Sequence, residues 1–325
     1  MIVDVHGHLP PSAYIKALSR RKKIPRIEMR DGGEVSILYG KGLQYSVDER
    51  MISLDKKLEA MNKSKVDLQI LGIIMPGLDN LEKEDAHNLT REVNDEFAAL
   101  QDKYRRNFLA VGTVPLQYPD IAIEELRRIK NELGMPGVEI FSNVAGRPLD
   151  SPEFLPFFAE AEKLRMPILL HPTLPLMAEF TSSYGLTGVV GYLFDTTLAI
   201  LRIIFSGILE KHPKLKIILP HLGSTIPYLI GRIDHQFSIN PDCRQKISKP
   251  PSEYFKLVYV DTAQSLNRPS LECAYRVIGP KRIMFGTDYP FADLSKSIKS
   301  IADLDIPEEE KHEIFEKNAV EMFGI

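Results

Sequence analysis

The sequence contains no tryptophan, only two cysteines and no long uninterrupted run of apolar residues. Cys243 and Cys273 lack the short spacing of a metal or redox pair, so both thiols are expected to be free in a reducing compartment. The apolar stretch 198–209 is shorter than the roughly 18 residues that a membrane span needs, and it carries Arg202. The first residues enter a strand-like segment without a charged leader. We therefore expect a cytoplasmic protein with no membrane partner.

A strong excess of either charge is also absent. The 325 residues include 41 Lys and Arg against 44 Asp and Glu, which gives a formal net charge of -3. No global basic field attracts nucleic acid or anionic lipid, so neither partner is expected. With 44% hydrophobic residues the chain can bury a large core, in one large domain or two smaller ones.

Short apolar runs alternate with longer helical patterns from one end of the chain to the other. The predicted strands cover residues 1–6, 66–74, 108–116, 137–141, 167–172, 216–221, 257–263 and 282–289. The predicted helices cover 83–105, 119–133, 152–164, 191–211, 224–236, 268–278, 293–304 and 307–322. No Gly-rich turn of the type GxGxxG follows the first strand, which argues against a doubly wound sheet. The pattern predicts an α/β fold, a (β/α)8 TIM barrel that forms one domain over residues 1–325.

Two segments interrupt this alternation. Residues 9–50 contain a predicted hairpin (26–40) around Asp31-Gly32-Gly33, and residues 173–190 follow the fifth strand. Both begin at the carboxyl end of a strand, which is the active-site face of a barrel. We expect both insertions to form walls or lids of a substrate pocket.

Metal-binding side chains recur at the ends of the predicted strands. His6 and His8 end the first strand, and His171, His221 and Asp288 end the fifth, sixth and eighth. Side chains two residues apart on a strand point to the same side, so the two N-terminal histidines can chelate one ion, whereas Asp4 would point away from them. A lone histidine at a strand end is more often a hydrogen-bonded wall residue than a ligand. Five such groups on one rim predict a metal site.

Three imidazoles and one carboxylate suit a single divalent ion, with Zn²⁺ as the first expectation and Mn²⁺ as the alternative. We assign His6, His8, His171 and Asp288 as the ligands. His221 is then free to move protons, because the pKa of an imidazole lies near neutrality. The residues alone leave open which histidine is the fourth ligand and which the proton shuttle.

The chain resembles the amidohydrolase superfamily, in particular the amidohydrolase 2 branch typified by aminocarboxymuconate semialdehyde decarboxylases. The resemblance covers essentially the whole chain and rests on DVHGH (4–8), ILLHP (168–172), the segment 194–234, PPSEYF (250–255) and IMFGTDYPF (283–291). It implies the same four metal ligands and His221 as the catalytic histidine. Glu139 stands on the fourth strand where binuclear members carry a lysine, which implies one ion.

The same resemblance implies that Arg232 binds a substrate carboxylate, reaching the pocket of a neighbouring subunit in a homodimer. From the residues alone, Arg232 is equally a solvated helix residue. Tyr45 occupies the position of a second substrate-binding arginine, and a phenol cannot replace a bidentate carboxylate clamp without changing what is bound. The related phenolic-acid decarboxylases usually carry Glu-x-His in place of His6-Gly7-His8, so the match to them is also incomplete.

We therefore expect a metal-dependent, non-oxidative decarboxylase that acts on a small unsaturated or aromatic carboxylic acid. The ion would bind the substrate or activate water, and His221 would act as the acid or base. Two alternatives use the same groups: hydrolysis of an amide, ester or lactone, with Asp288 or His221 taking the proton, and hydration of a keto or enol acid. A metal-binding module without enzyme activity would instead have a closed first shell, which an additional histidine argues against.

Overall fold

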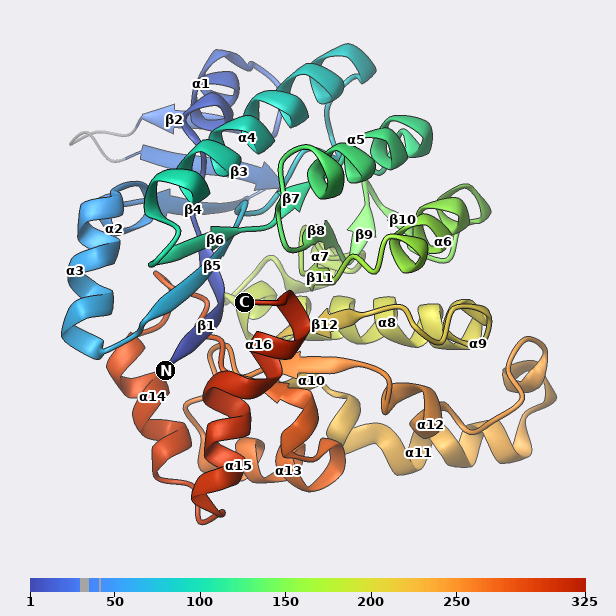
Figure 1. Cartoon of the computed structure of the whole chain (residues 1–325). Coiled ribbons are helices and arrows are strands. Elements are labelled where there is room, and N and C mark those ends of the chain that lie inside the picture. Colours follow the sequence, from blue (N-terminus) through green and yellow to red (C-terminus); the bar gives the residue numbers. More distant parts are fainter. Residues whose placement is uncertain (30–34, 41) are drawn as a thin grey trace.

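Eight parallel strand positions surround a common axis in the computed structural model, which describes residues 1–29, 35–40 and 42–325 (Figure 1). They are β1 (Val3–His8), β5 (Leu68–Gly72), β6 and β7 (Phe108–Ala110 and Gly112–Thr113, one position interrupted at Val111), β8 (Val138–Phe141), β11 (Ile168–His171), β12 (Ile217–Leu219), β13 (Tyr259–Asp261) and β14 (Ile283–Met284). The order β1-β5-β6 continues as β7-β8-β11-β12-β13-β14, so neighbours in the chain are neighbours in the barrel. The predicted barrel is confirmed.

Backbone hydrogen bonds join the first strand to the segment around the last. The amide of Val5 donates to the carbonyl of Phe285, and that of His8 donates to the carbonyl of Tyr289, each at 2.9 Å. The amide of Asp288 donates in return to the carbonyl of His6 at 2.8 Å. The contacts that complete the ring therefore also bring the histidine pair beside the aspartate.

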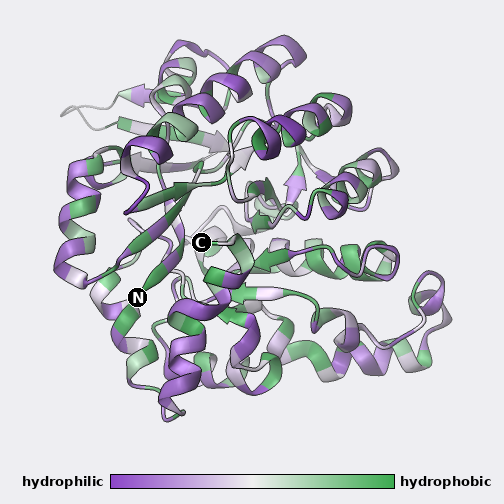
Figure 2. Ribbon diagram, in the orientation of Figure 1, coloured by the Kyte–Doolittle hydropathy of each residue, from purple (hydrophilic) through white to green (hydrophobic). Residues whose placement is uncertain are grey.

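Helices cover the outside of the strands, with apolar faces directed inward and polar faces outward (Figure 2). The longer ones are α3 (Leu54–Ser64), α4 (Lys83–Tyr104), α5 (Pro119–Asn131), α6 (Leu155–Lys163), α8 (Tyr192–Phe205), α11 (Ile226–Ile239), α13 (Arg268–Ile278) and α14 (Leu294–Ala302). The shorter ones are α2 (Glu49–Ile52), η1 (Pro152–Phe154), α9 (Ile208–Lys211), α10 (Pro220–Gly223), η3 (Pro241–Arg244), α12 (Pro251–Phe255), η4 (Pro280–Arg282), α15 (Glu308–His312), η5 (Glu313–Lys317) and α16 (Asn318–Phe323). The single helix predicted over 191–211 is wrong, because Gly207 adopts a left-handed φ of 78° and separates α8 from α9.

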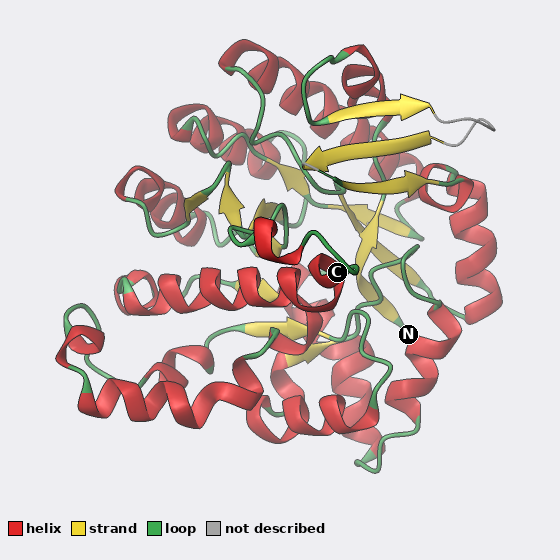
Figure 3. Cartoon of the chain, turned by 180° about the vertical axis from the view of Figure 1, so that it is seen from behind, coloured by secondary structure: helices red, strands yellow, loops and turns green. Residues whose placement is uncertain are grey.

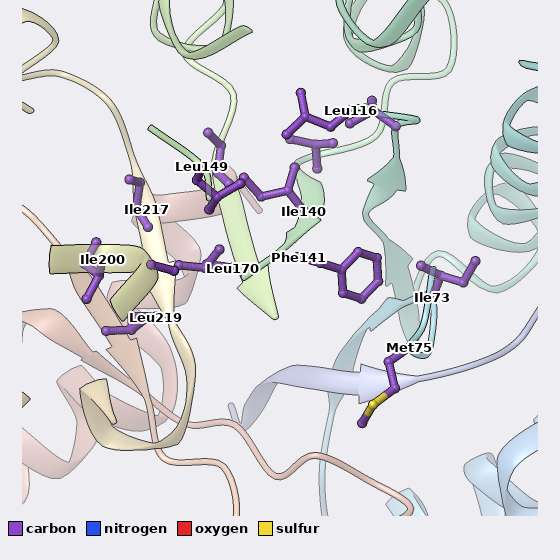
Figure 4. Close-up of a cluster of buried hydrophobic side chains, with 14 of the residues drawn as sticks. Ile73, Met75, Leu116, Ile140, Phe141, Leu149, Leu170, Ile200, Ile217 and Leu219 are labelled. Atoms are coloured by element: carbon purple, nitrogen blue, oxygen red, sulfur yellow. The ribbon is translucent and has the colours of Figure 1, made fainter. Parts of the chain in front are cut away.

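Two buried clusters support the barrel. The larger packs strand side chains against the surrounding helices; Figure 4 shows Leu170 and Leu219 beside Ile200 of α8. The smaller fills the barrel interior, where Val3 and Met284 meet Met322 and Phe323 of the C-terminal helix. The interior at this end is therefore packed with side chains, and the opposite end is left for the functional groups.

Both insertions form structure at the carboxyl ends of the strands. The first contains α1 (Ser12–Arg20) and an antiparallel sheet of β2 (Arg26–Met29), β3 (Val35–Gly40) and β4 (Leu43–Val47), seen from behind in Figure 3. The predicted hairpin is confirmed in its strands, whereas its expected turn at Asp31-Gly32-Gly33 lies outside the described residues. The second contains α7 (Ala178–Thr181) and the π-helical η2 (Thr187–Gly191). A separate small hairpin of β9 (Asn143–Val144) and β10 (Arg147–Pro148) follows strand β8.

Residues Thr187–Phe205, which combine η2 and α8, form a continuous helix of 19 residues with a mean hydropathy of 1.6. By length and composition alone this helix could cross a membrane, so the expectation that no segment reaches that length was wrong. Its inward face packs in the barrel, with Asp195, Ile200 and Ile203 buried. We interpret it as a barrel helix with an additional apolar outer face.

Candidate metal centre

Four side chains with metal-binding atoms meet at the carboxyl ends of the strands. His6 and His8 come from β1, His171 ends β11 and Asp288 follows β14. All four residues are buried, and one ligand atom from each lies within 4.8 Å of the others. The structure thus brings together the quartet that the sequence predicted.

The distances within this quartet fit a cation. Nε2 of His6 lies 3.2 Å from Nε2 of His8, and Oδ1 of Asp288 lies 2.9 Å from Nε2 of His8. The Oδ1 atom is buried and has no hydrogen-bond partner among the described residues. A buried carboxylate oxygen without a donor is costly unless a cation neutralises it. The residues present therefore fit one divalent ion.

Neighbouring groups orient two of the imidazoles. Nδ1 of His6 donates to Oδ2 of Asp261 at 2.8 Å, and Nδ1 of His171 donates to the carbonyl of Pro172 at 2.7 Å. Each Nε2 then carries the lone pair toward the centre, which is the arrangement that a metal-ligating histidine requires. Asp4 points away, as expected, and accepts from the Thr287 hydroxyl at 2.7 Å.

Electrostatics adjust the protonation of the ligands. Burial lowers the pKa of His8, and burial together with the neighbouring histidines holds the pKa of His171 well below its usual range. Both rings are thus neutral and able to donate lone pairs. The pKa of Asp288 is held well below its usual range, because the attraction of His6 and hydrogen bonding outweigh burial. His6 differs: the carboxylates of Asp261 and Asp288 outweigh burial and raise its pKa to about 10. An ion would therefore bind beside an ionised carboxylate and two neutral imidazoles, and would displace the proton of His6.

The predicted acid–base residue lies beside this quartet. His221 is not at a strand end, because β12 stops at Leu219 and Pro220 begins the short turn α10, where His221 has a left-handed φ of 55°. Its backbone amide donates to Oδ1 of Asp261 at 2.9 Å, and its Nε2 lies 3.6 Å from Oδ2 of Asp288. This position leaves the ring next to the ligands and in contact with the cavity above them.

A cavity of about 300 Å³ opens beside the quartet, with His171 and Asp288 in its lining. Its lining includes the side chains of Tyr39, Tyr45, Met75, Tyr192, His221, Gln264 and Phe291. No arginine or lysine lines it in the part of the chain that the structure describes. The lining of the cavity therefore combines aromatic side chains with two members of the quartet, His171 and Asp288.

The two residues proposed to bind substrate occupy different places. Tyr45 lines the cavity, and its hydroxyl donates to the carbonyl of Met75 at 2.5 Å. Arg232 lies on α11, is exposed, and is not among the residues that line the cavity of its own chain. A role for Arg232 in substrate binding within this chain finds no support in that placement, and its role in a neighbouring subunit stays a prediction.

Three further polar residues belong to the site and were not predicted as members. Asp261 ends β13 and links His6 to His221, and Gln264 donates through its amide to Oδ2 of Asp288. Glu139, noted only as a replacement for lysine, lies beneath the quartet, and burial raises its pKa to about 8. An aspartate directly after an apolar strand, as in LVYVDTA, was a signal that could have identified the first of these.

Residues 3–325 match the family Amidohydro_2, described as amidohydrolase. The chain belongs to the amidohydrolase family. It is 33% identical over 288 residues to a 2-amino-3-carboxymuconate-6-semialdehyde decarboxylase of Dictyostelium discoideum, with 86% of this chain and 79% of that protein covered. It is 31% identical over 323 residues to a gamma-resorcylate decarboxylase of Rhizobium sp. strain MTP-10005, with 95% and 98% covered. These matches confirm the resemblance inferred from the sequence.

Solved structures extend this agreement to the fold. The chain superimposes on a 5-carboxyvanillate decarboxylase from Sphingomonas paucimobilis with a TM-score of 0.89 at 25% identity, covering 100% of this chain and 99% of that one. A dihydroxybenzoic acid decarboxylase from Polaromonas sp. JS666, solved with bound manganese, gives a TM-score of 0.84 at 24% identity, with 99% and 96% covered.

Proposed function

We propose that this amidohydrolase is a metal-dependent, non-oxidative decarboxylase of a hydroxylated aromatic acid. The curated relatives described above are decarboxylases, which confirms the predicted class of enzyme, a lyase of the amidohydrolase superfamily. One observation supports this substrate class most directly: two members of the metal-binding quartet, His171 and Asp288, line a cavity that has aromatic walls and no Lys or Arg among its described lining residues. The acid group that is removed then has one place to bind, at the quartet.

The ion would be held by His6, His8, His171 and Asp288, and when bound it supplies a Lewis acid for the substrate oxygens. The donor set suits Zn²⁺, which we propose first, and also Mn²⁺. Elemental analysis of the purified protein, followed by activity after chelation and reloading with each ion, decides between them.

His221 is placed to supply the proton that decarboxylation needs. A proton held at Nε2 of His221 transfers to the ring carbon that carries the carboxyl group. The bond between that carbon and the carboxyl carbon then breaks, CO₂ leaves, and the electron pair of the broken bond restores the aromatic ring. The ring of His221 receives a new proton from solvent when the product leaves.

Tyr45 favours a hydroxyl group on the substrate over a second carboxylate. Its own proton is engaged by the carbonyl of Met75, so its oxygen can only accept a hydrogen bond from a ligand. A carboxylate offers no donor, whereas a phenolic hydroxyl does. Burial holds the pKa of Tyr45 well above its usual value, so it stays neutral.

We further propose that the protein is a cytoplasmic homodimer. Large apolar side chains are exposed on and near the second insertion and α8: Leu176, Met177, Phe180, Tyr184, Val189, Phe194 and Leu198. A concentration of exposed apolar side chains in neighbouring segments of the chain is typical of a protein interface, and a second copy of the chain would cover them. The neighbouring helix α11 would carry Arg232 into that interface, and both cysteines are free as a reducing compartment requires.

Mixing two inactive variants tests whether Arg232 acts in the partner's site. In a mixed dimer of Arg232→Ala and His221→Ala, one site contains an intact His221 from its own chain and an intact Arg232 from the partner. Recovered activity supports the shared site. A monomer in light scattering, or no recovery after subunit exchange, would contradict it.

The reaction itself is tested with hydroxybenzoic acids, by measuring both CO₂ release and loss of the substrate absorbance. We expect turnover that His221→Ala abolishes while the bound metal is retained. The matched control is His235→Ala, since His235 is an exposed histidine of α11. Turnover of a lactone or ester without CO₂ release from any acid would instead favour the hydrolase alternative.

A further inference from the structure

Gln264 contacts the metal-binding quartet from outside it. The residue lies in the loop after β13 and lines the cavity described above, and its side-chain amide donates to Oδ2 of Asp288. It also lines an outer cleft of about 510 Å³ that shares Tyr192 and His221 with that cavity. This single side chain therefore stands between the carboxylate ligand and the outer cleft.

The two oxygens of Asp288 have different surroundings. Oδ1 faces the imidazoles, 2.9 Å from His8 and 3.5 Å from His6. Oδ2 accepts a hydrogen bond from the side-chain amide of Gln264, while Nε2 of His221 lies 3.6 Å from it. The amide fixes the rotation of the carboxylate so that Oδ1 is directed at the ligands. It also supplies Oδ2 with a hydrogen-bond donor of its own, while Nε2 of His221 stays 3.6 Å away and faces the cavity.

The backbone at this position supports a role beyond packing. Gln264 has a φ of 53° and Asp288 a φ of 65°, in the left-handed region that residues other than glycine rarely adopt. Strained residues of this kind persist where the surrounding structure holds them, and they concentrate at functional sites. Glycine would fit this backbone without strain but would supply no amide donor.

We propose that Gln264 is a positioning residue that holds Asp288 in its metal-binding orientation. The inference rests on the metal site of the proposed function, but not on decarboxylation. Partners that orient a metal ligand typically change metal affinity about 10–100-fold when they are removed. Gln264 should therefore affect metal binding itself as well as turnover.

The test is the affinity for Zn²⁺ and Mn²⁺, measured by competition with a fluorescent chelator. Gln264→Leu keeps the size of the side chain and removes its donor. The matched control is Gln44→Leu, since Gln44 is an exposed glutamine of the same cavity with no contact to the quartet among the described residues. We expect at least about a tenfold weaker affinity in Gln264→Leu and a wild-type affinity in Gln44→Leu.

Gln264→Gly separates positioning from simple structural support. This variant relieves the left-handed backbone while removing the amide, so we expect an unchanged or raised melting temperature of the metal-free protein together with weakened metal binding. Wild-type metal affinity in both Gln264 variants would overturn the inference and leave the proposed function intact. Weakened metal binding in a protein that decarboxylates no acid would support the inference and overturn the function. A wild-type protein that binds neither ion would overturn both.

Discussion

The buried Lys57 provides a quantitative prediction about stability. Its side chain is fully buried in α3, its Nζ has no hydrogen-bond partner in the described part of the chain, and it lies 4.8 Å from the centre of the Tyr289 ring. Burial lowers its pKa to about 7, against the opposing attraction of Asp4 and Asp48. The folded state thus disfavours the charged form that the unfolded chain keeps up to about pH 10.5.

The magnitude follows from the size of this shift. A difference of about 3.5 pKa units corresponds to roughly 5 kcal/mol at about 1.36 kcal/mol per unit. Between pH 7 and 10.5 the unfolded chain binds the proton that folded Lys57 has released, so stability rises with pH through this window. At and below pH 7 the penalty is present almost in full. Replacing Lys57 by Met removes it but loses about 1 kcal/mol of cation–π attraction to Tyr289 and about 1 kcal/mol from imperfect packing.

We therefore expect Lys57→Met to be about 3 kcal/mol more stable than the wild type at pH 7, with the difference shrinking toward pH 10. Equilibrium unfolding in urea at several pH values measures it. Lys56→Met is the control, because Lys56 is an exposed neighbour on the same helix. A variant of Lys57 no more stable than wild type at pH 7, or a difference independent of pH, would refute the reasoning.

Three further predictions concern the site and its surroundings. Asp261→Asn weakens the acceptor that orients His6, and we expect metal affinity to fall about 10–100-fold by chelator competition, with unchanged affinity as the contradicting result. Burial raises the pKa of Asp79 from 3.8 to about 7. Folded Asp79 therefore keeps a proton that the unfolded chain loses, and wild-type stability should fall by up to about 4 kcal/mol between pH 4 and 7. In urea unfolding, the stability of Asp79→Asn should lack the part of this fall that Asp79 causes. If stability depends on pH identically in the variant and the wild type, the prediction for Asp79 is wrong. Finally, the ion binds only the folded chain, so chelation should lower the melting temperature, by an amount equivalent to about 2.7 kcal/mol if free metal had been at 100 times its dissociation constant. A melting curve insensitive to chelator would count against the metal site.

The sequence predicted most reliably those features that follow from the regular geometry of parallel strands. Strands buried on both faces read as apolar runs, so the order of the barrel and its two insertions could be predicted. The spacing of His6 and His8 likewise requires both rings to lie on one side of an extended strand. Since parallel strands end at one rim, His171 and Asp288 could be added to the pair without knowledge of any distance.

Features that depend on local backbone geometry could not be predicted in the same way. Pro220 ends β12 early, so His221 reaches the site from a left-handed turn and not from a strand. Gln264, which donates to Asp288, also has a left-handed backbone, and an amide in a loop carries no distinctive signal in the sequence. The acceptor role of Tyr45 depends on where its proton points, which the carbonyl of Met75 determines.

The hydroxyl groups of Tyr39 and Tyr192 lie 2.5 Å apart and connect the first insertion to the start of α8, directly after the second. This contact has a consequence for redesign of the enzyme. A chimera that takes only the first insertion from a relative would lose Tyr39 and leave the hydroxyl of Tyr192 without its partner. The first insertion should therefore be exchanged together with the second insertion and the first turn of α8, as one unit that carries the roof of the pocket.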